Sequence, residues 1–141
     1  MAIKSKIDGN SRISLSDDQL FDQSTANAGG LDSTSGNTFV GYLAGQSVDA
    51  GSINNTFIGH GVGDASLADA TNNVGVGAEA LSALTQGDKN VAIGYQAMLA
   101  TTTPGGNVAV GNRAGDANLT GGSNVWIGRN AGGATTDVDS T

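Results

Sequence analysis

The sequence predicts an all-β fold, a parallel β-solenoid or β-roll built from six coils of 17–18 residues. Three observations lead to this prediction. A five-residue stretch that starts with Asn and ends with Gly occurs six times, and its Asn-to-Asn steps are 18, 18, 17, 17 and 17 residues. The residues one and three places after the Asn are β-branched every time, and a small apolar residue recurs three places after the Gly. A fixed period of this size is typical of stacked repeat architectures.

Positions in the repeat are counted from its Asn, which is position 0. The six Asn residues are Asn37, Asn55, Asn73, Asn90, Asn107 and Asn124. Alternate side chains of a strand point to one face, and β-branched residues suit a pleated, half-buried surface. We therefore expect positions +1 and +3 to face the interior and position +2 to look outward. Gly at +4 permits a corner, after which a second short stretch and a turn complete the coil.

The repeated Asn has a structural interpretation. In a stack each Asn lies over the next, so that their side-chain amides can form a ladder of hydrogen bonds. Asn also favours turns, and a plain turn-forming role is the alternative.

The flanking segments differ from the repeats, which occupy residues 37–132. Residues 1–16 read as two short strands around a turn, with Lys4, Lys6 and Arg12 close together. They form either a solvated edge or a docking segment. Residues 17–36 are a loop or a degenerate capping coil, and residues 133–141 are a polar tail without a recognisable cap.

Composition limits the class of protein. The chain has 141 residues, 23 of them Gly, and only 4% aromatic residues, so a single domain built from it is short of core and is expected to oligomerise. A net charge of −7 and a pI of about 4.2 disfavour nucleic acid as a partner. There is no cysteine for a disulfide or a thiolate metal site. No apolar run resembles a signal peptide or reaches the roughly 20 residues that cross a bilayer.

The repeat resembles known families. Asn90-Val-Ala-Ile-Gly94 and Asn107-Val-Ala-Val-Gly111 resemble the head repeats of trimeric autotransporter adhesins. The stretch Gly36-Asn-Thr-Phe-Val-Gly-Tyr-Leu-Ala-Gly45 is similar to repeats of phage tail fibres. The resemblance implies a left-handed parallel β-roll, parallel homotrimers and attachment to cells or surfaces. Without a visible signal peptide, it favours a fibre that is made in the cytoplasm and released with a phage or phage-like particle.

Two rows of side chains are candidate contact sites. If position +2 faces neighbouring subunits, the large residues Phe39, Phe57 and Trp126 fill the two ends of a shared interface; otherwise they are singly exposed aromatics. Position +5 follows the corner and varies freely. Its residues Tyr42, His60, Tyr95 and Arg129 are candidates for binding a surface, with a merely solvated edge as the alternative.

Chemical sites find little support. His60 is the only histidine, and a lone histidine is a poor metal site. Gly-Asp pairs such as Gly63-Asp64 suggest calcium, but the nonapeptide pattern of calcium β-rolls is absent. No catalytic set can be argued, and we expect neither an enzyme nor a cofactor.

The expected function is therefore structural. The first hypothesis is a homotrimeric segment of a tail fibre or similar particle, extracellular or on a virion, that binds cell-surface polymers such as glycans. The alternative is an extracellular filament subunit that polymerises head to tail. An ice- or mineral-binding role ranks last, because the Thr residues do not repeat in register.

Overall fold

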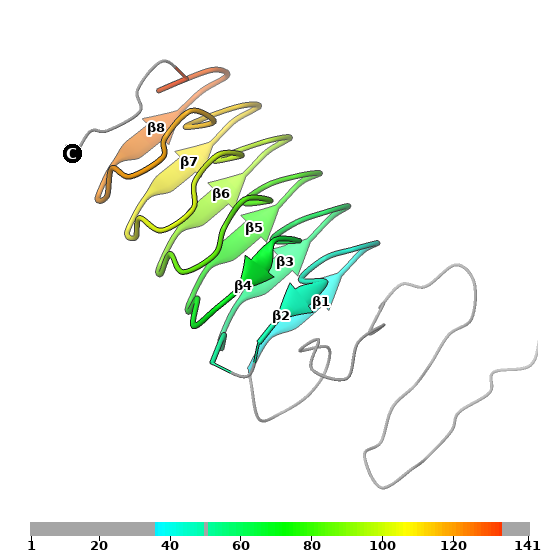
Figure 1. The fold of residues 1–141 in the computed structure, drawn as a ribbon. Helices are drawn as coiled ribbons and strands as arrows, with labels where there is room; N and C mark the ends of the chain where they lie inside the picture. The colour runs from blue at the N-terminus through cyan, green and yellow to red at the C-terminus, as the bar shows by residue number, and fades with distance from the viewer. Residues whose placement is uncertain (1–35, 50, 134–141) are drawn as a thin grey trace, which may run out of the picture.

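The computed structural model describes residues 36–49 and 51–133, and this part of the chain is a parallel β-solenoid, as the repeat predicts (Figure 1). It contains short strands and turns and no helix. The strands are β1 (Thr38–Val40), β2 (Ser47–Val48), β3 (Thr56–Ile58), β4 (Ser66–Leu67), β5 (Val74–Val76), β6 (Val91–Ile93), β7 (Val108–Val110) and β8 (Val125–Ile127). The strand pair expected over 1–16, nearly all of the segment 17–36 and nearly all of the tail 133–141 lie outside the described residues.

One strand from each repeat joins the main sheet. Its order is β1-β3-β5-β6-β7-β8, and every neighbouring pair is parallel. The register is the repeat itself, since Val74 pairs with Val91, and Val91 in turn pairs with Val108. The sequence period of 17 or 18 residues is therefore the length of one turn of the solenoid.

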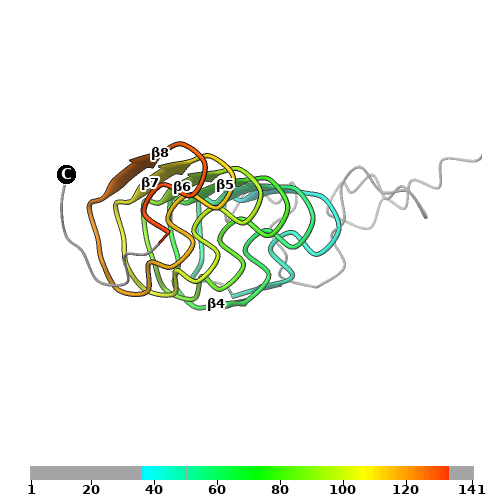
Figure 2. The ribbon, with the colours of Figure 1, turned by 90° about the horizontal axis from the view of Figure 1, so that it is seen from above.

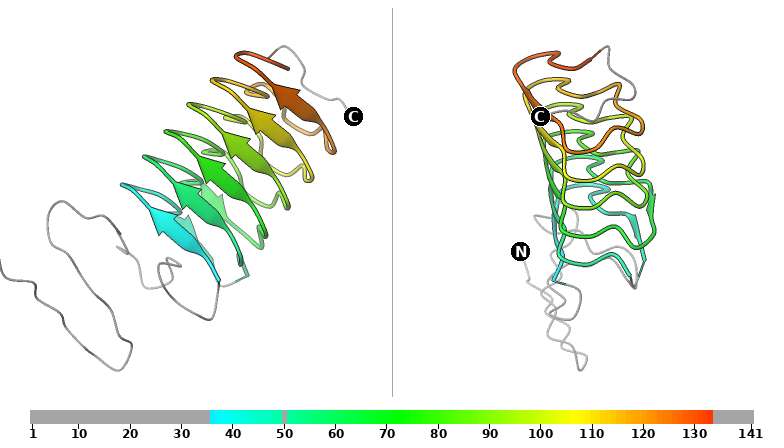
Figure 3. Two further views of the ribbon diagram at one scale, coloured as in Figure 1. Left: turned by 180° about the vertical axis from the view of Figure 1, so that it is seen from behind. Right: turned by 90° about the vertical axis from the view of Figure 1, so that its left-hand side faces the viewer.

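The other side of each coil, which we call the return side, is less regular. The strands β2 and β4 form a second, two-stranded parallel sheet, and Figure 2 shows β4 across the solenoid from the main sheet. In later coils backbone bonds continue this side without a strand, as when Thr85 N–H donates to the Thr102 carbonyl at 2.9 Å. Figure 3 shows the resulting stack of similar coils from two further directions.

The Gly at +4 is required by the corner. Gly94 has a φ of 137°, a conformation that L side chains rarely adopt. A Cβ at this position would also collide with the Gly111 carbonyl of the next coil. The Gly column thus lets successive corners stack at the spacing that strand pairing sets.

The face that the main sheet turns inward differs from our expectation. Position +2 is buried inside the chain, and positions +1 and +3 point outward; the residues at +2 are Phe39, Phe57, Gly75, Ala92, Ala109 and Trp126. Across the interior they meet residues of the return side such as Val48, Leu67 and Leu84. The prediction that +1 and +3 line the core was wrong. A β-branched residue fits a pleated strand on either face, so its presence does not reveal which face is buried.

Interior size is balanced between positions +2 and +8 of a coil. Where +2 is aromatic, as in Phe57, position +8 is a Gly, and a Cβ on Gly63 would collide with the Phe57 ring. In two repeats +2 is small, as Gly75 and Ala92, and position +8 is large, namely Leu81 and Met98. Ala109 is the exception, because its +8 residue is Gly115, which lies against the Trp126 ring of the next coil. Close packing of the interior explains this exchange, because both side chains fill one space.

Candidate interaction surface

The outward side of the main sheet is a flat, apolar surface, which we call the sheet face. It consists of the twelve side chains at +1 and +3: Thr38, Val40, Thr56, Ile58, Val74, Val76, Val91, Ile93, Val108, Val110, Val125 and Ile127. None of them is charged. All are half-buried or exposed, and among the most exposed are Ile58 (41%), Ile93 (39%), Val125 (56%) and Ile127 (72%). A contiguous exposed apolar surface of this kind makes the sheet face a candidate interaction site.

The aromatic residues proposed for a subunit interface do not lie on this surface. Phe39 is 2% exposed, Phe57 is fully buried and Trp126 is 9% exposed, all within a single chain. The Phe39 and Phe57 rings stack on each other with centroids 5.2 Å apart. Trp126 packs against Gly115 and Gly132, where a Cβ would collide with the indole. The prediction that these side chains face neighbouring subunits was wrong, because the Gly residues at +8 make room for them inside.

The Asn ladder is present and runs along the buried side of the strand starts. The Oδ1 atom of each Asn accepts the backbone N–H of the next Asn, at 2.8–3.1 Å. From Asn73 onward the side-chain Nδ2 also donates to the Oδ1 of the preceding Asn, at 3.0–3.3 Å. Each of the first five Nδ2 groups further donates to a carbonyl of its own coil, as Asn90 does to Pro104. The amides therefore join the coils to one another and close each coil.

The residues at +5 form one edge of the sheet face, which we call the corner edge: Tyr42, His60, Ala78, Tyr95, Asn112 and Arg129. Tyr42 is 64% exposed, Tyr95 is 47% exposed, and His60 and Arg129 are exposed as well. The Tyr42 and His60 rings stack with centroids 5.5 Å apart. The four residues predicted as a surface-binding set thus lie in one column. Ala78 lies between His60 and Tyr95, and Asn112 lies between Tyr95 and Arg129.

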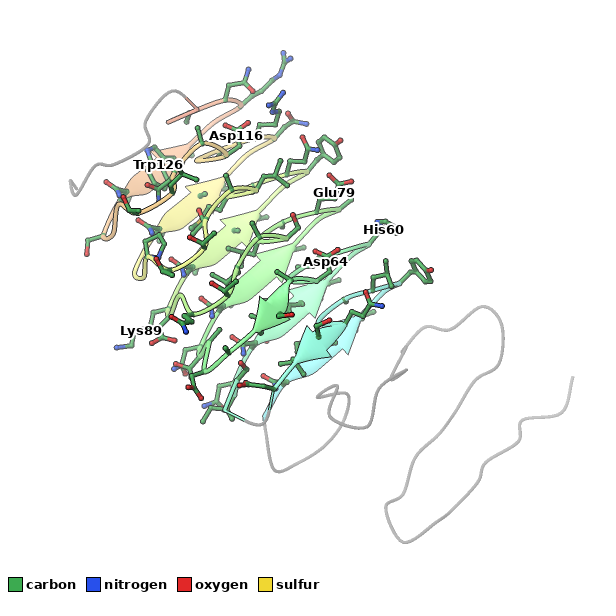
Figure 4. The ribbon with its side chains drawn as sticks, viewed as in Figure 1. His60, Asp64, Glu79, Lys89, Asp116 and Trp126 are labelled. Carbon is green, nitrogen blue, oxygen red and sulfur yellow. The ribbon has the colours of Figure 1, made fainter. Side chains whose placement is uncertain are left out.

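Acidic groups lie beside the corner edge (Figure 4). Burial raises the pKa of the Asp64 carboxyl above its ordinary value, and the nearby Glu79 carboxylate adds to the rise. A hydrogen bond from the Asp64 backbone N–H and the proximity of His60 oppose it. Glu79 Oε2 accepts a hydrogen bond from Gln96 Nε2 at 2.7 Å. This hydrogen bond links two successive coils beside the corner edge.

The opposite edge of the sheet face, which we call the turn edge, contains the two residues before each Asn. They are Ile53 and Asn54, Thr71 and Asn72, Asp88 and Lys89, Gly105 and Gly106, and Gly122 and Ser123. Figure 4 shows Lys89 across the sheet from His60 and Glu79. Asp88 Oδ1 fixes this edge by accepting the backbone N–H and the hydroxyl of Thr71, at 2.7 and 2.9 Å. Ile53 is the exposed apolar residue of this edge, at 38%.

A carboxylate also fixes the first turn of the return side. Asp49 Oδ1 accepts hydrogen bonds from the Ser52 hydroxyl, the Ser52 N–H and the Asp69 N–H. The Ser52 hydroxyl is the largest cause that lowers the pKa of Asp49 from its ordinary value. The role of this Asp is therefore to order a turn.

Within residues 36–49 and 51–133, no group of three His, Cys, Asp or Glu side chains could hold a metal ion. The same residues include no helix of the length and apolarity that a membrane span requires.

The chain was also compared with known proteins. It matches no family model, and no curated protein or solved structure is found to be similar to it. The sheet face and its two edges are therefore interpreted from their own chemistry.

Proposed function

We propose that this chain is a structural segment of an attachment fibre, in which copies of the chain associate through the sheet face. The observation that carries the proposal is the uncharged row of half-buried and exposed side chains, mostly Val and Ile, along the whole stack. Uncharged and repeated at every strand, this surface can pack against the same surface of neighbouring copies that lie parallel to it. Removing it from water stabilises the assembly in proportion to the apolar area covered.

The interior supports a mechanical role. The described coils are joined by backbone ladders on both sides and by the Asn amides, and no buried side-chain polar atom among them lacks a partner. Such a stack is stiff along its axis and suits reach. Three copies arranged in parallel, outside the cell or on a virion, with cell-surface polymers as the target, are what the resemblance of the repeats implies.

The test is the mass of the protein in solution. Multi-angle light scattering should give a multiple of the 13.9 kDa chain mass. Ile93→Lys should shift the mass to the single chain, because the assembly would bury an unpaired ammonium at each contact. Leu119→Lys is the matched control: Leu119 is 44% exposed against 39% for Ile93 but follows the return side, so its mass should stay unchanged. A wild-type protein that remains a single chain at every concentration contradicts the proposal.

A head-to-tail filament is the second candidate, and the end of the sheet favours it. Within the described residues β8 pairs only with β7, and Val125 and Ile127 are more exposed than the Ile residues of inner strands. An open parallel edge can accept a further strand. Electron micrographs separate the two candidates, since rods of fixed length indicate a fibre segment and long threads of uniform width indicate end-to-end polymerisation.

A further inference from the structure

The sheet face is small for the task that the proposed function gives it. Six strands about 4.8 Å apart and about 10 Å long cover roughly 290 Å² on each copy. Stable protein contacts cover about 800 Å² on each partner. Copies that touched only through the sheet face would therefore resemble weak crystal contacts rather than a lasting assembly.

Further exposed apolar surface lies beside the sheet face. The large apolar side chains that are exposed in the described chain are Tyr42, Ile53, Ile58, Ile93, Tyr95, Leu119, Val125 and Ile127. Four of them belong to the sheet face, two to the corner edge and one to the turn edge. Leu119 alone follows the return side of the solenoid. The exposed large apolar side chains are therefore concentrated on the sheet face and its two edges.

We infer that the contact between copies extends from the sheet face across both of its edges. In this arrangement the next copy of the chain covers Tyr42 and Tyr95 on the corner edge and Ile53 on the turn edge. The inference rests on the proposed function and specifies its contact residues. Two added columns of side chains roughly double the width of the face, which raises the area covered to about 580 Å² on each copy, close to the lower limit of stable interfaces.

The chemistry of the edges fits the rim of such a contact. Tyr combines a large apolar ring with a hydroxyl that can stay in contact with water, which is why it is enriched at interfaces. Tyr42 is already held in place by the His60 ring, so covering it costs little side-chain entropy. The small residue Ala78 lies between these aromatic residues in the column and leaves space for a neighbour's side chain.

This assignment competes with polymer binding by the corner edge. A Tyr42 ring covered by a second copy is not available to a sugar, and a Tyr95 ring that stacks on a sugar is not covered by a second copy. A second copy is favoured because the apolar residues continue across the sheet face to Ile53 on the far edge, where no aromatic ring exists for a sugar to stack on.

The first experiment compares Tyr95→Glu with Leu119→Glu, at side chains that are 47% and 44% exposed. Position +5 accepts His, Ala, Asn and Arg in other coils, so Tyr95→Glu should fold, and circular dichroism checks this. Light scattering should show Tyr95→Glu shifted toward the single-chain mass, whereas Leu119→Glu should keep the wild-type mass. Binding of each variant to dextran, a neutral polysaccharide, is measured in parallel.

The second experiment uses the absence of cysteine from the chain. Single Cys residues replace Tyr42, Ile53, Tyr95 or Leu119, and their labelling by a maleimide is timed. The first three should label several-fold more slowly than the Cys at 119 in the assembled protein. Adding Ile93→Lys should remove that difference, because it separates the copies.

The outcomes test the inferred contact area and the proposed function separately. If Ile93→Lys separates the copies but Tyr95→Glu does not, and the Cys at 95 labels as fast as that at 119, the contact stops at the sheet face. The inference is then overturned and the proposed function stands. Loss of dextran binding by Tyr95→Glu at unchanged mass overturns it equally and assigns the corner edge to a polymer. A wild-type protein that is a single chain rejects the proposed function itself, and the inference with it.

Discussion

At the scale of single residues, the buried Asn side chains of the ladder each have several hydrogen-bond partners. Asn90 Nδ2 donates to the Pro104 carbonyl at 2.9 Å and to Asn73 Oδ1 at 3.0 Å. Its Oδ1 accepts the backbone N–H of Asn107 at 3.1 Å and the Asn107 Nδ2 group at 3.3 Å. Asn90 is fully buried, so no water is available to replace a lost partner. One side chain thus satisfies polar groups of three neighbouring coils.

Asn90→Ala should therefore destabilise the protein strongly. It leaves the Pro104 carbonyl and the Asn107 N–H buried without a partner, and each such group costs about 1–3 kcal/mol. We expect the free energy of unfolding, measured with urea, to fall by about 3 kcal/mol. Asn112→Ala is the control, since Asn112 is exposed at the corner edge and its loss should change the free energy by about 0.5 kcal/mol or less. Similar losses for both variants would show that the ladder contributes nothing specific.

The sequence predicts this ladder but not the face on which the neighbouring residues lie. A polar residue that returns at one position of a solenoid must stack on itself, so its role follows from the period alone. The inward direction of +2 does not follow, because Gly75, Ala92 and Ala109 are too small to suggest a core, and Val or Ile on the outside looks like a core residue. The signal that could have revealed it is the exchange between +2 and +8, in which Phe57 occurs with Gly63 and Gly75 occurs with Leu81.

At the scale of the element, that exchange predicts how a coil can be rebuilt. Phe57→Ala empties the interior of its coil and should lower the free energy of unfolding by about 3–5 kcal/mol. Gly63→Leu alone should also destabilise, because its Cβ would collide with the Phe57 ring. The double variant recreates the combination of a small +2 and a large +8 residue that is found in coils 3 and 4, the third and fourth repeats, which start at Asn73 and Asn90. There Leu81 and Met98 have φ values of 55° and 53° at position +8.

The double variant should therefore lose less free energy of unfolding than the two single variants lose in sum. The difference should exceed about 1 kcal/mol, the size of coupling expected for residues in contact. Urea unfolding of the four proteins in this cycle measures the coupling. A matched pair at separate sites, Phe57→Ala with Gly115→Ala, should add without coupling, because Gly115 lies against Trp126. Strict additivity of the Phe57 and Gly63 changes would contradict a shared interior space.

The strands show how far local sequence determines an element here. Each strand of the main sheet is three residues long, because Gly at +4 already turns the chain. In the described coils the second short stretch is a strand only as β2 and β4. In later coils Thr101 and Asn118 occupy the interior in place of the apolar residues Leu67 and Leu84. Side-chain hydrogen bonds then join the return sides of neighbouring coils, as when Thr101 Oγ1 donates to the Asn118 carbonyl at 3.0 Å. The repeat does not encode these local differences.

At the scale of the whole molecule, the fold is one-dimensional. Within the described residues, the backbone hydrogen bonds of each coil stay in that coil or go to the coil before or after it, as when Gly94 N–H donates to the Val76 carbonyl and Gly111 N–H to the Ile93 carbonyl. A repeat protein of this kind is stabilised by nearest-neighbour contacts and tolerates changes in repeat number. The sequence predicts this property from its period, whereas the surface proposed to join copies can be identified only from the side-chain positions.

Deleting residues 91–107 removes one period and connects Asn90 to Val108, so every column stays in register. The shortened protein should fold, because coil 3 then meets coil 5 with the same backbone ladder, and Glu79 comes to lie beside Arg113 at position +6. Small-angle scattering should show a rod about 4.8 Å shorter, the spacing of one strand.

Deleting residues 91–102 is the control. It removes fewer residues but shifts the columns, which places exposed side chains inside and separates the Asn amides. That variant should lose its β-type circular dichroism, and equal behaviour of the two deletions would mean that the register of the coils does not determine the fold.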